Sequence, residues 1–263
     1  MHLGAISPGF QADFVVLDNR QDLNVTDVFY KGKLVDRNAP IRVKTCGRAL
    51  KHTVHLDKVK AEQFVLPIGK KKTHVIGINP SQITTEDLAV SLQPAANYVP
   101  TDGYSKVAAV ERHHNTGKIG VAVAKGYGIR NGAVASSVSH DSHNIIVIGD
   151  NDRDMALAVD EIIRTQGGYT VVENGEVFET LPLPIMGLMS DAGFESVNET
   201  LGRMIKKAHE MGVPADIEPF ITLSFLALPV IPTLRITPRG LCLLTAKGPE
   251  ILQEESQAGK RLQ

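Results

Sequence analysis

A run of polar side chains that can carry protons lies between two apolar segments near the middle of the sequence. It reads Ser-Ser-Val-Ser-His-Asp-Ser-His-Asn over residues 136–144. Residues 132–135 before it and 145–149 after it are apolar and strand-like. A buried polar group without a partner costs about 1–3 kcal/mol, so a core seldom keeps so many without a use for them. The pattern predicts a functional surface where one buried strand ends and the next begins.

Imidazole, carboxylate, hydroxyl and amide groups in this run could hold or orient a small substrate or a water molecule. The candidate catalytic residues are His140, Asp141 and His143, and the candidate substrate-binding residues are Ser139, Ser142 and Asn144. The alternative is a structural turn, in which the Asp and Ser side chains bond backbone amides while the histidines pack nearby.

Two familiar chemistries are not favoured in this run. A Ser-His-Asp triad is disfavoured because contiguous residues seldom reach triad geometry and no Gly-x-Ser-x-Gly elbow is present. The pairs His52/His55 and His140/His143 lack a carboxylate-rich ligand set, and His-x-Glu with Pro-Cys-x-x-Cys, the zinc deaminase signature, is absent. We therefore predict no metal site in this chain.

A second polar cluster lies in the loop of a predicted hairpin, between strand-like residues 107–112 and 119–124. Arg112 and His113 are further candidates for the same functional surface. The alternative for this segment is an ion pair between Glu111 and Arg112.

The elements around these clusters predict an α+β fold of hairpins and separate packed helices. Helices are expected after Asp150 or Asn151, ending at Gly167-Gly168, and over residues 195–211. Asn174-Gly175 predicts a hairpin turn. Strands are expected at residues 64–66 and 74–78, and the apolar residues 221–231, broken by Pro229, predict a buried strand or loop.

The first 45 residues differ in character from the rest of the chain. Strands are expected at residues 14–18, 25–30 and 34–36, with little else. Three short strands leave exposed edges and cannot bury both faces of a sheet. We expect an incomplete β-sandwich segment over residues 1–45 and a mixed α+β domain over residues 46–263.

Composition excludes several classes of protein. Lys+Arg 28 against Asp+Glu 29 argues against a nucleic-acid binder that relies on phosphate neutralisation. No apolar run reaches about 20 residues and no signal peptide is evident, so no membrane association is expected and a cytoplasmic location is the default. The two cysteines, Cys46 and Cys242, are too few for a disulfide framework or a Cys-based zinc site.

Several motifs carry a resemblance to a known family. Residues 4–18 and 28–35 resemble the segment that follows the catalytic barrel in amidohydrolase-superfamily enzymes, where the chain returns to a small β-sandwich. The remainder is similar to the C-terminal domain of bacterial and archaeal adenine deaminases. The segments that carry this similarity are Glu111-Arg112-His113 and residues 125–128, 136–144, 166–168, 181–190 and 223–232.

The resemblance implies hydrolytic deamination of adenine to hypoxanthine and ammonia within purine catabolism. It also implies divalent metals, manganese or iron, in a barrel, and a homodimer. The sequence departs from the family because it begins at the sandwich motif and contains no His-x-His pair. We therefore expect the C-terminal portion of such a hydrolase, binding no metal and inactive by itself.

In that interpretation the chain completes the sandwich and covers a partner barrel with a lid. The lid would contain the candidate residues of the polar run together with Arg112 and His113, and the barrel would be part of the same polypeptide or a separate one. The alternative is a stand-alone purine-binding or regulatory module without catalysis.

Overall fold

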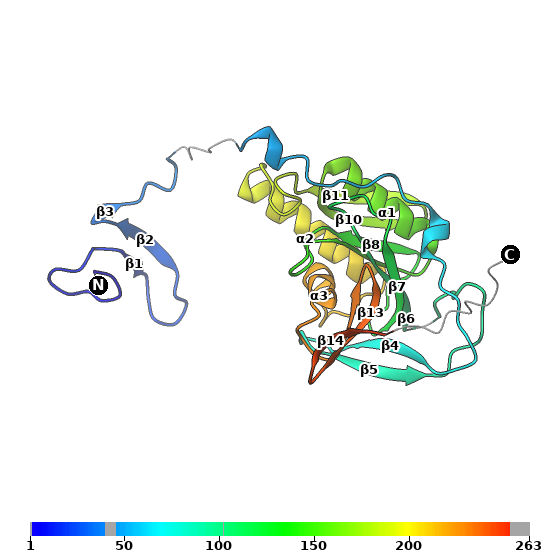
Figure 1. Cartoon of the computed structure of the whole chain (residues 1–263). Helices are drawn as coiled ribbons and strands as arrows, with labels where there is room; N and C mark the ends of the chain where they lie inside the picture. The colour runs from blue at the N-terminus through cyan, green and yellow to red at the C-terminus, as the bar shows by residue number, and fades with distance from the viewer. Residues whose placement is uncertain (1, 40–45, 102, 253–263) are drawn as a thin grey trace. The chain divides into compact units, whose positions relative to one another are not determined.

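The computed structural model describes residues 2–39, 46–101 and 103–252. The chain separates into two compact units, Met1–Thr45 and Cys46–Gln263, and each is described by itself. Figure 1 shows the elements of both units.

The first unit is a three-stranded antiparallel sheet in the order β1-β2-β3, with no second sheet among its described residues 2–39. Its strands are β1 (Phe14–Leu17), β2 (Val25–Tyr30) and β3 (Lys33–Leu34), close to the predicted ranges. The rings of Phe14 and Phe29 stack across β1 and β2 with centroids 4.7 Å apart. The apolar residues that follow in β1 are 38–52% exposed, so most of this sheet faces solvent.

The second unit is built on an eight-stranded sheet in the order β11-β10-β8-β9-β6-β7-β4-β5. All neighbours in this sheet are antiparallel except β4 and β7, which are parallel. Its strands are β4 (Thr73–Ile78), β5 (Thr85–Val90), β6 (Tyr104–Val110), β7 (Ile119–Lys125), β8 (Gly132–Ser136), β9 (Ile145–Gly149), β10 (Gly168–Glu173) and β11 (Glu176–Pro182).

Both faces of the large sheet are covered, which explains why β8 and β9 are buried throughout. One face packs against α1 (Asp152–Thr165) and the short 3₁₀ helix η2 (Ala61–Phe64). The other face packs against α2, α3 and a small antiparallel sheet. These elements are α2 (Phe194–Glu210), α3 (Pro219–Leu226), β12 (Leu234–Thr237), β13 (Gly240–Thr245) and β14 (Gly248–Ile251). The observed fold is the predicted α+β class.

The two long helices and the Asn-Gly hairpin form where the sequence predicts them. The Asn151 side chain caps α1 by accepting a 2.8 Å hydrogen bond from the Asp154 amide, and Gln166 ends the helix in a left-handed conformation. Asn174 and Gly175 have φ of 52° and 82°, as a type I′ turn requires. Local signals alone were sufficient for these elements.

The prediction of a strand or loop is wrong for residues 221–226, which belong to α3, and is confirmed for residues 227–231, which form a loop. Glu218 caps this helix by accepting from the Ile221 amide, and Pro219 occupies the first turn, where its missing N–H costs nothing. The helix buries most of its residues on several sides, so its sequence has no amphipathic pattern to reveal the helical period.

Two further differences concern short or late elements. Residues 64–66 do not form the predicted strand, because Phe64 ends η2 and the next pairing is an isolated bridge between Ile68 and Ala95. The small sheet β12-β13-β14, also not predicted, covers β6 and β7.

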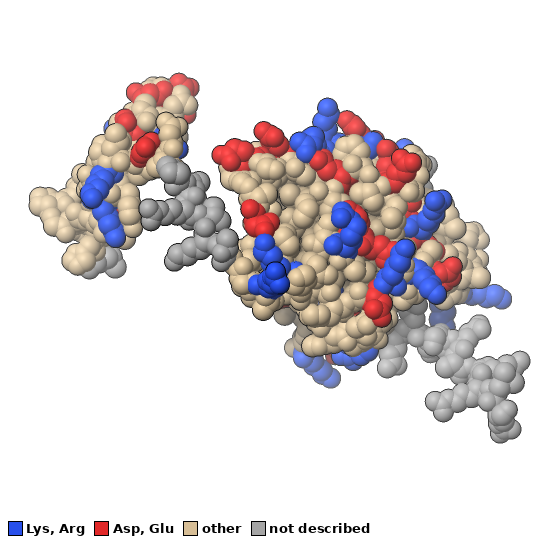
Figure 2. Space-filling view, turned by 90° about the horizontal axis from the view of Figure 1, so that it is seen from above, with Lys and Arg blue, Asp and Glu red and all other residues tan. Residues whose placement is uncertain are grey.

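The distribution of surface charge and the lengths of the helices match the expectations from the near-balanced charge and from the lack of a long apolar run. Figure 2 shows Lys and Arg interspersed with Asp and Glu over the visible face of the second unit. Within the described ranges, no helix is both long and apolar enough to span a bilayer.

Candidate functional site

The predicted functional surface lies at one end of the eight-stranded sheet. Residues 137–144 form the loop between the fully buried strands β8 and β9, as expected. Val110 at the end of β6 pairs with Ile145 at the start of β9, which places the loop 111–118 beside it. We call these two loops, together with Ser224 and Phe225 of α3, the loop cluster.

Arg112 is a structural centre of the loop cluster rather than an exposed lid residue. It is 2% exposed and donates through Nε to the His143 carbonyl oxygen. Nη1 donates to the Thr53 carbonyl at 3.0 Å, and Nη2 donates to the Met186 carbonyl at 3.0 Å. Burial lowers the pKa of Arg112 to about 10, which still leaves the guanidinium charged at neutral pH. One buried cation therefore joins three separate segments of the chain.

The alternative of an ion pair between Glu111 and Arg112 is wrong. The Glu111 carboxylate instead accepts hydrogen bonds from the backbone amides of His113, His114 and Thr116 at 2.5, 2.9 and 3.1 Å. Burial by itself raises the pKa of Glu111, but these bonds and one from the Thr116 hydroxyl outweigh burial and lower it to about 2. Adjacent amides satisfy the carboxylate because the loop turns back over it.

The two loops of the cluster are bonded to each other. The His113 ring contacts the Ser142 carbonyl oxygen through Nε2 at 2.7 Å, which makes Nε2 the donor. The Asn144 side chain accepts a 3.3 Å bond from the Arg112 amide and donates a 3.1 Å bond to the Ser142 hydroxyl. Four predicted site residues, Arg112, His113, Ser142 and Asn144, are therefore brought together.

His143 is held so that one ring nitrogen acts as an acceptor. The Ser139 amide donates to His143 Nδ1 at 3.4 Å, and the His143 amide donates to the Ser139 carbonyl at 2.6 Å. Burial is the largest cause that lowers the pKa of His143, and the neighbouring His140 and Arg112 lower it further. This arrangement favours a neutral imidazole that carries its proton on Nε2, a donor suited to a neutral ligand.

His140 presents an aromatic surface at the edge of the cluster. Its ring lies 5.7 Å from the ring of His143 and 5.2 Å from the ring of Phe225, measured between centroids. The His140 side chain is 40% exposed and that of Asp141 is 84% exposed, with Nδ1 and Oδ1 3.7 Å apart. These partly exposed rings could stack against a flat ligand, whereas Asp141 extends into solvent.

Two residues of α3 belong to the cluster although the sequence analysis gave them no role. The His140 amide donates to the Ser224 carbonyl at 3.0 Å, and the Phe225 ring lies against the His140 ring in a tilted arrangement, with 33° between the ring planes. The hydroxyls of Ser139 and Ser224 are buried and make no hydrogen bond with any described residue. The sequence contained one signal for this role, namely Ser224 within the apolar run 220–228, because a buried hydroxyl needs a hydrogen-bond partner.

The metal ions that the resemblance implies do not fit this arrangement. Within residues 2–39, 46–101 and 103–252, no group of three or more His, Cys, Asp or Glu side chains is placed to hold a metal ion. His140 and His143 lie near each other, but the nearest carboxylate, Asp141, extends into solvent. The described side chains offer hydrogen bonding and stacking.

Comparison with known proteins identifies the family. Residues 82–247 match the adenine deaminase C-terminal domain. The chain is 50% identical over 241 residues to an adenine deaminase of Desulfitobacterium hafniense, covering 91% of this chain and 42% of that protein. It is 45% identical over 244 residues to an adenine deaminase of Nitratidesulfovibrio vulgaris strain DP4, covering 90% of this chain and 42% of that protein.

A third relative matches a similar share of the chain at lower identity. It is adenine deaminase 2 of Carboxydothermus hydrogenoformans, which is 41% identical over 245 residues, covering 91% of this chain and 43% of that protein. The chain thus spans about two fifths of the length of these relatives and matches them over nine tenths of its own length. The chain belongs to the adenine deaminase C-terminal domain family.

Proposed function

We propose that this chain is the C-terminal part of an adenine deaminase, the hydrolase that converts adenine and water to hypoxanthine and ammonia. In this proposal the loop cluster forms a lid over a catalytic barrel and helps to hold adenine. The observation that carries the proposal is the pair of partly exposed rings, His140 and His143, on one loop. The buried Arg112 holds this loop in place by donating a hydrogen bond to the His143 carbonyl oxygen.

The chemistry of the cluster supports contact with a purine. Adenine is flat and neutral, so it can stack on the His140 and Phe225 rings. A neutral His143 can donate from Nε2 to a purine ring nitrogen without placing a charge beside it. In this role the cluster orients the base while the hydrolytic step takes place elsewhere.

The first unit supports the proposal of a partner. The β1 residues Val15, Val16 and Leu17 are 52%, 39% and 38% exposed, although each is strongly apolar. A strand of this kind is stabilised when further strands or a second sheet cover it. We infer that a β-sandwich is completed by strands from the catalytic portion of the enzyme.

The proposed metals lie outside this chain. We infer that manganese or iron is held by the catalytic barrel, because the described side chains of this chain offer no suitable set of ligands. The chain by itself should therefore release no ammonia from adenine.

A chimera tests the proposal. The 263-residue chain would replace the matching C-terminal portion of the Desulfitobacterium hafniense relative, with which it is 50% identical. We expect the chimera to release ammonia from adenine in the presence of manganese or ferrous iron. The control is the relative truncated where the match begins, which should be inactive, as should the isolated chain.

Three outcomes would contradict the proposal in different ways. Ammonia release by the isolated chain above a metal-free control would show that it contains a catalytic site of its own. A folded but inactive chimera whose isolated chain binds adenine would favour the non-catalytic purine-binding module. Full activity of the truncated relative would show that turnover of adenine does not require the C-terminal portion, and so would contradict the proposed lid.

A further inference from the structure

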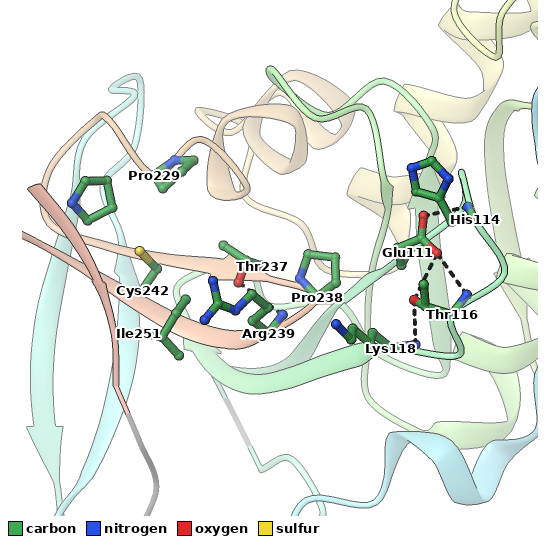
Figure 3. A pocket seen from close by; sticks show the side chains of 11 residues that line it. Glu111, His114, Thr116, Lys118, Pro229, Thr237, Pro238, Arg239, Cys242 and Ile251 are labelled. Atoms are coloured by element: carbon green, nitrogen blue, oxygen red, sulfur yellow. Dashed lines mark hydrogen bonds between the residues drawn. The ribbon is translucent and has the colours of Figure 1, made fainter.

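A groove lies between the loop 111–118 and the small sheet β12-β13-β14. It has a volume of about 470 Å³, within the usual range for small-molecule sites. Figure 3 shows Lys118 and Arg239 among the side chains that line it. The family comparison assigns no role to this groove.

Close backbone contact fixes the two sides of the groove relative to each other. A Cβ atom on Gly120 of β7 would lie 2.1 Å from the Thr237 carbonyl oxygen and 2.6 Å from the Gly240 amide nitrogen. The turn between β12 and β13, which carries Arg239, therefore lies directly on β7, two residues from Lys118. The opposite wall is held by Glu111, which bonds three amides of its own loop. The groove is therefore preformed.

The charges in the groove favour an anion. Within the described ranges, neither Lys118 nor Arg239 forms an ion pair, and both are exposed. Glu111 is the acidic residue in the lining, and four hydrogen bonds from the backbone and Thr116 already occupy its carboxylate. Two cations face one occupied carboxylate, so a net positive charge remains for a ligand.

The remaining walls are rigid and apolar. Pro229, Pro238 and Pro249 line the groove together with Ile251. Proline has no N–H and a fixed ring, so these walls offer flat packing surfaces without donors. The Thr237 hydroxyl donates to the Gly240 carbonyl at 3.0 Å, and its oxygen accepts a 3.2 Å bond from the Arg239 amide. One lone pair of that oxygen is left to accept a hydrogen bond from a sugar hydroxyl.

We propose that this groove binds a nucleoside monophosphate. The phosphate would lie between Lys118 and Arg239, because a planar guanidinium pairs well with phosphate oxygens and an ammonium adds a point charge. The base would pack on the prolines. This site shares loop 111–118 with the lid of the proposed function, but it requires no turnover of adenine.

Binding of AMP to the intact 263-residue chain, measured by calorimetry, tests the proposal. We expect Lys118→Ala and Arg239→Ala each to weaken AMP binding about tenfold, as loss of one charge-assisted contact implies. Arg239→Lys should fall between Arg239→Ala and the unchanged chain, because it keeps the charge but loses the planar fork. Lys70→Ala removes an exposed lysine outside the groove and should leave affinity unchanged.

Separate probes divide the ligand into its parts. Adenosine and ribose 5-phosphate should each bind more weakly than AMP, since each lacks one half of the contacts. Added salt should weaken the binding of AMP more than the binding of adenosine, because salt screens the contacts of the phosphate. Absence of AMP binding at millimolar concentration would overturn the proposal, as would Arg239→Ala and Lys118→Ala variants that bind AMP as tightly as the unchanged chain. Either result leaves the proposed function intact, because that function is measured by ammonia release from the chimera.

Discussion

Arg112 donates a hydrogen bond from its guanidinium Nε to the backbone carbonyl oxygen of His143. The same side chain bonds carbonyl oxygens of Thr53 and Met186, and a Cβ atom on Gly187 would approach Arg112 Nη1 to 2.8 Å. The cation is thus enclosed by backbone from three segments. The position of the His143 ring depends on a residue that never reaches the surface.

Replacing Arg112 should therefore destabilise the fold. We expect Arg112→Ala to lower the free energy of unfolding by about 3 kcal/mol, because buried carbonyl oxygens lose their donors. Urea denaturation measures the change. Arg164→Ala is the matched control, since this arginine is 68% exposed and paired with Glu161, and it should cost less than about 1 kcal/mol. Equal effects of the two variants would refute a central role for Arg112.

Two glycines should respond in opposite directions to alanine. Gly120→Ala places a Cβ atom 2.1 Å from the Thr237 carbonyl oxygen and should cost at least about 2 kcal/mol of unfolding free energy. Gly202 lies in α2 with nothing within 4 Å of its Cβ position, so Gly202→Ala should add about 0.5–1 kcal/mol. Thermal denaturation of both variants measures the difference. A stable Gly120→Ala variant would show that the β12–β13 turn does not rest on β7.

The Glu111 carboxylate should make stability depend on acid pH. Its pKa in the folded chain is about 2, below the usual 4.5, so its contribution is fully present above pH 4.5 and is lost as the pH falls toward 2. After allowance for solvent screening, we expect Glu111→Gln to cost about 1–2 kcal/mol at pH 7.

Urea denaturation between pH 2 and pH 7 tests this dependence. The cost of Glu111→Gln should shrink as the pH falls, whereas Glu176→Gln, at an exposed carboxylate, should show little change at any pH. A cost for Glu111→Gln that stays constant with pH would mean that the amides bonded to Glu111 stabilise the loop without linkage to protonation.

The lid can be tested in the chimera. We expect His140→Ala to lower kcat/KM for adenine about tenfold, because it removes one stacking surface beside Phe225. Asp141→Asn should also lower turnover, and neither change should reduce the unfolding free energy by more than about 1 kcal/mol, since His140 is partly exposed and Asp141 is largely exposed. His74→Ala, at an exposed histidine paired with Asp87 on β5, is the control and should keep full kcat/KM. Unchanged kinetics for both loop variants would exclude contact between this loop and the substrate.

The sequence by itself determined the elements whose signals are local. The cap at Asn151, the turn at Asn174-Gly175 and the apolar face of residues 195–211 each depend on neighbours within a few positions. The polar run between β8 and β9 was also evident, because it interrupts apolar residues on both sides.

Tertiary structure decided the features that depend on distant residues. Residues 219–226 are helical although no amphipathic period marks them, since they are buried on several sides. Arg112 bonds carbonyls of Thr53 and Met186, 59 and 74 positions away, in preference to the adjacent Glu111. Sequence spacing carries no information about such contacts, because buried backbone carbonyls can accept from any side chain that the fold brings to them.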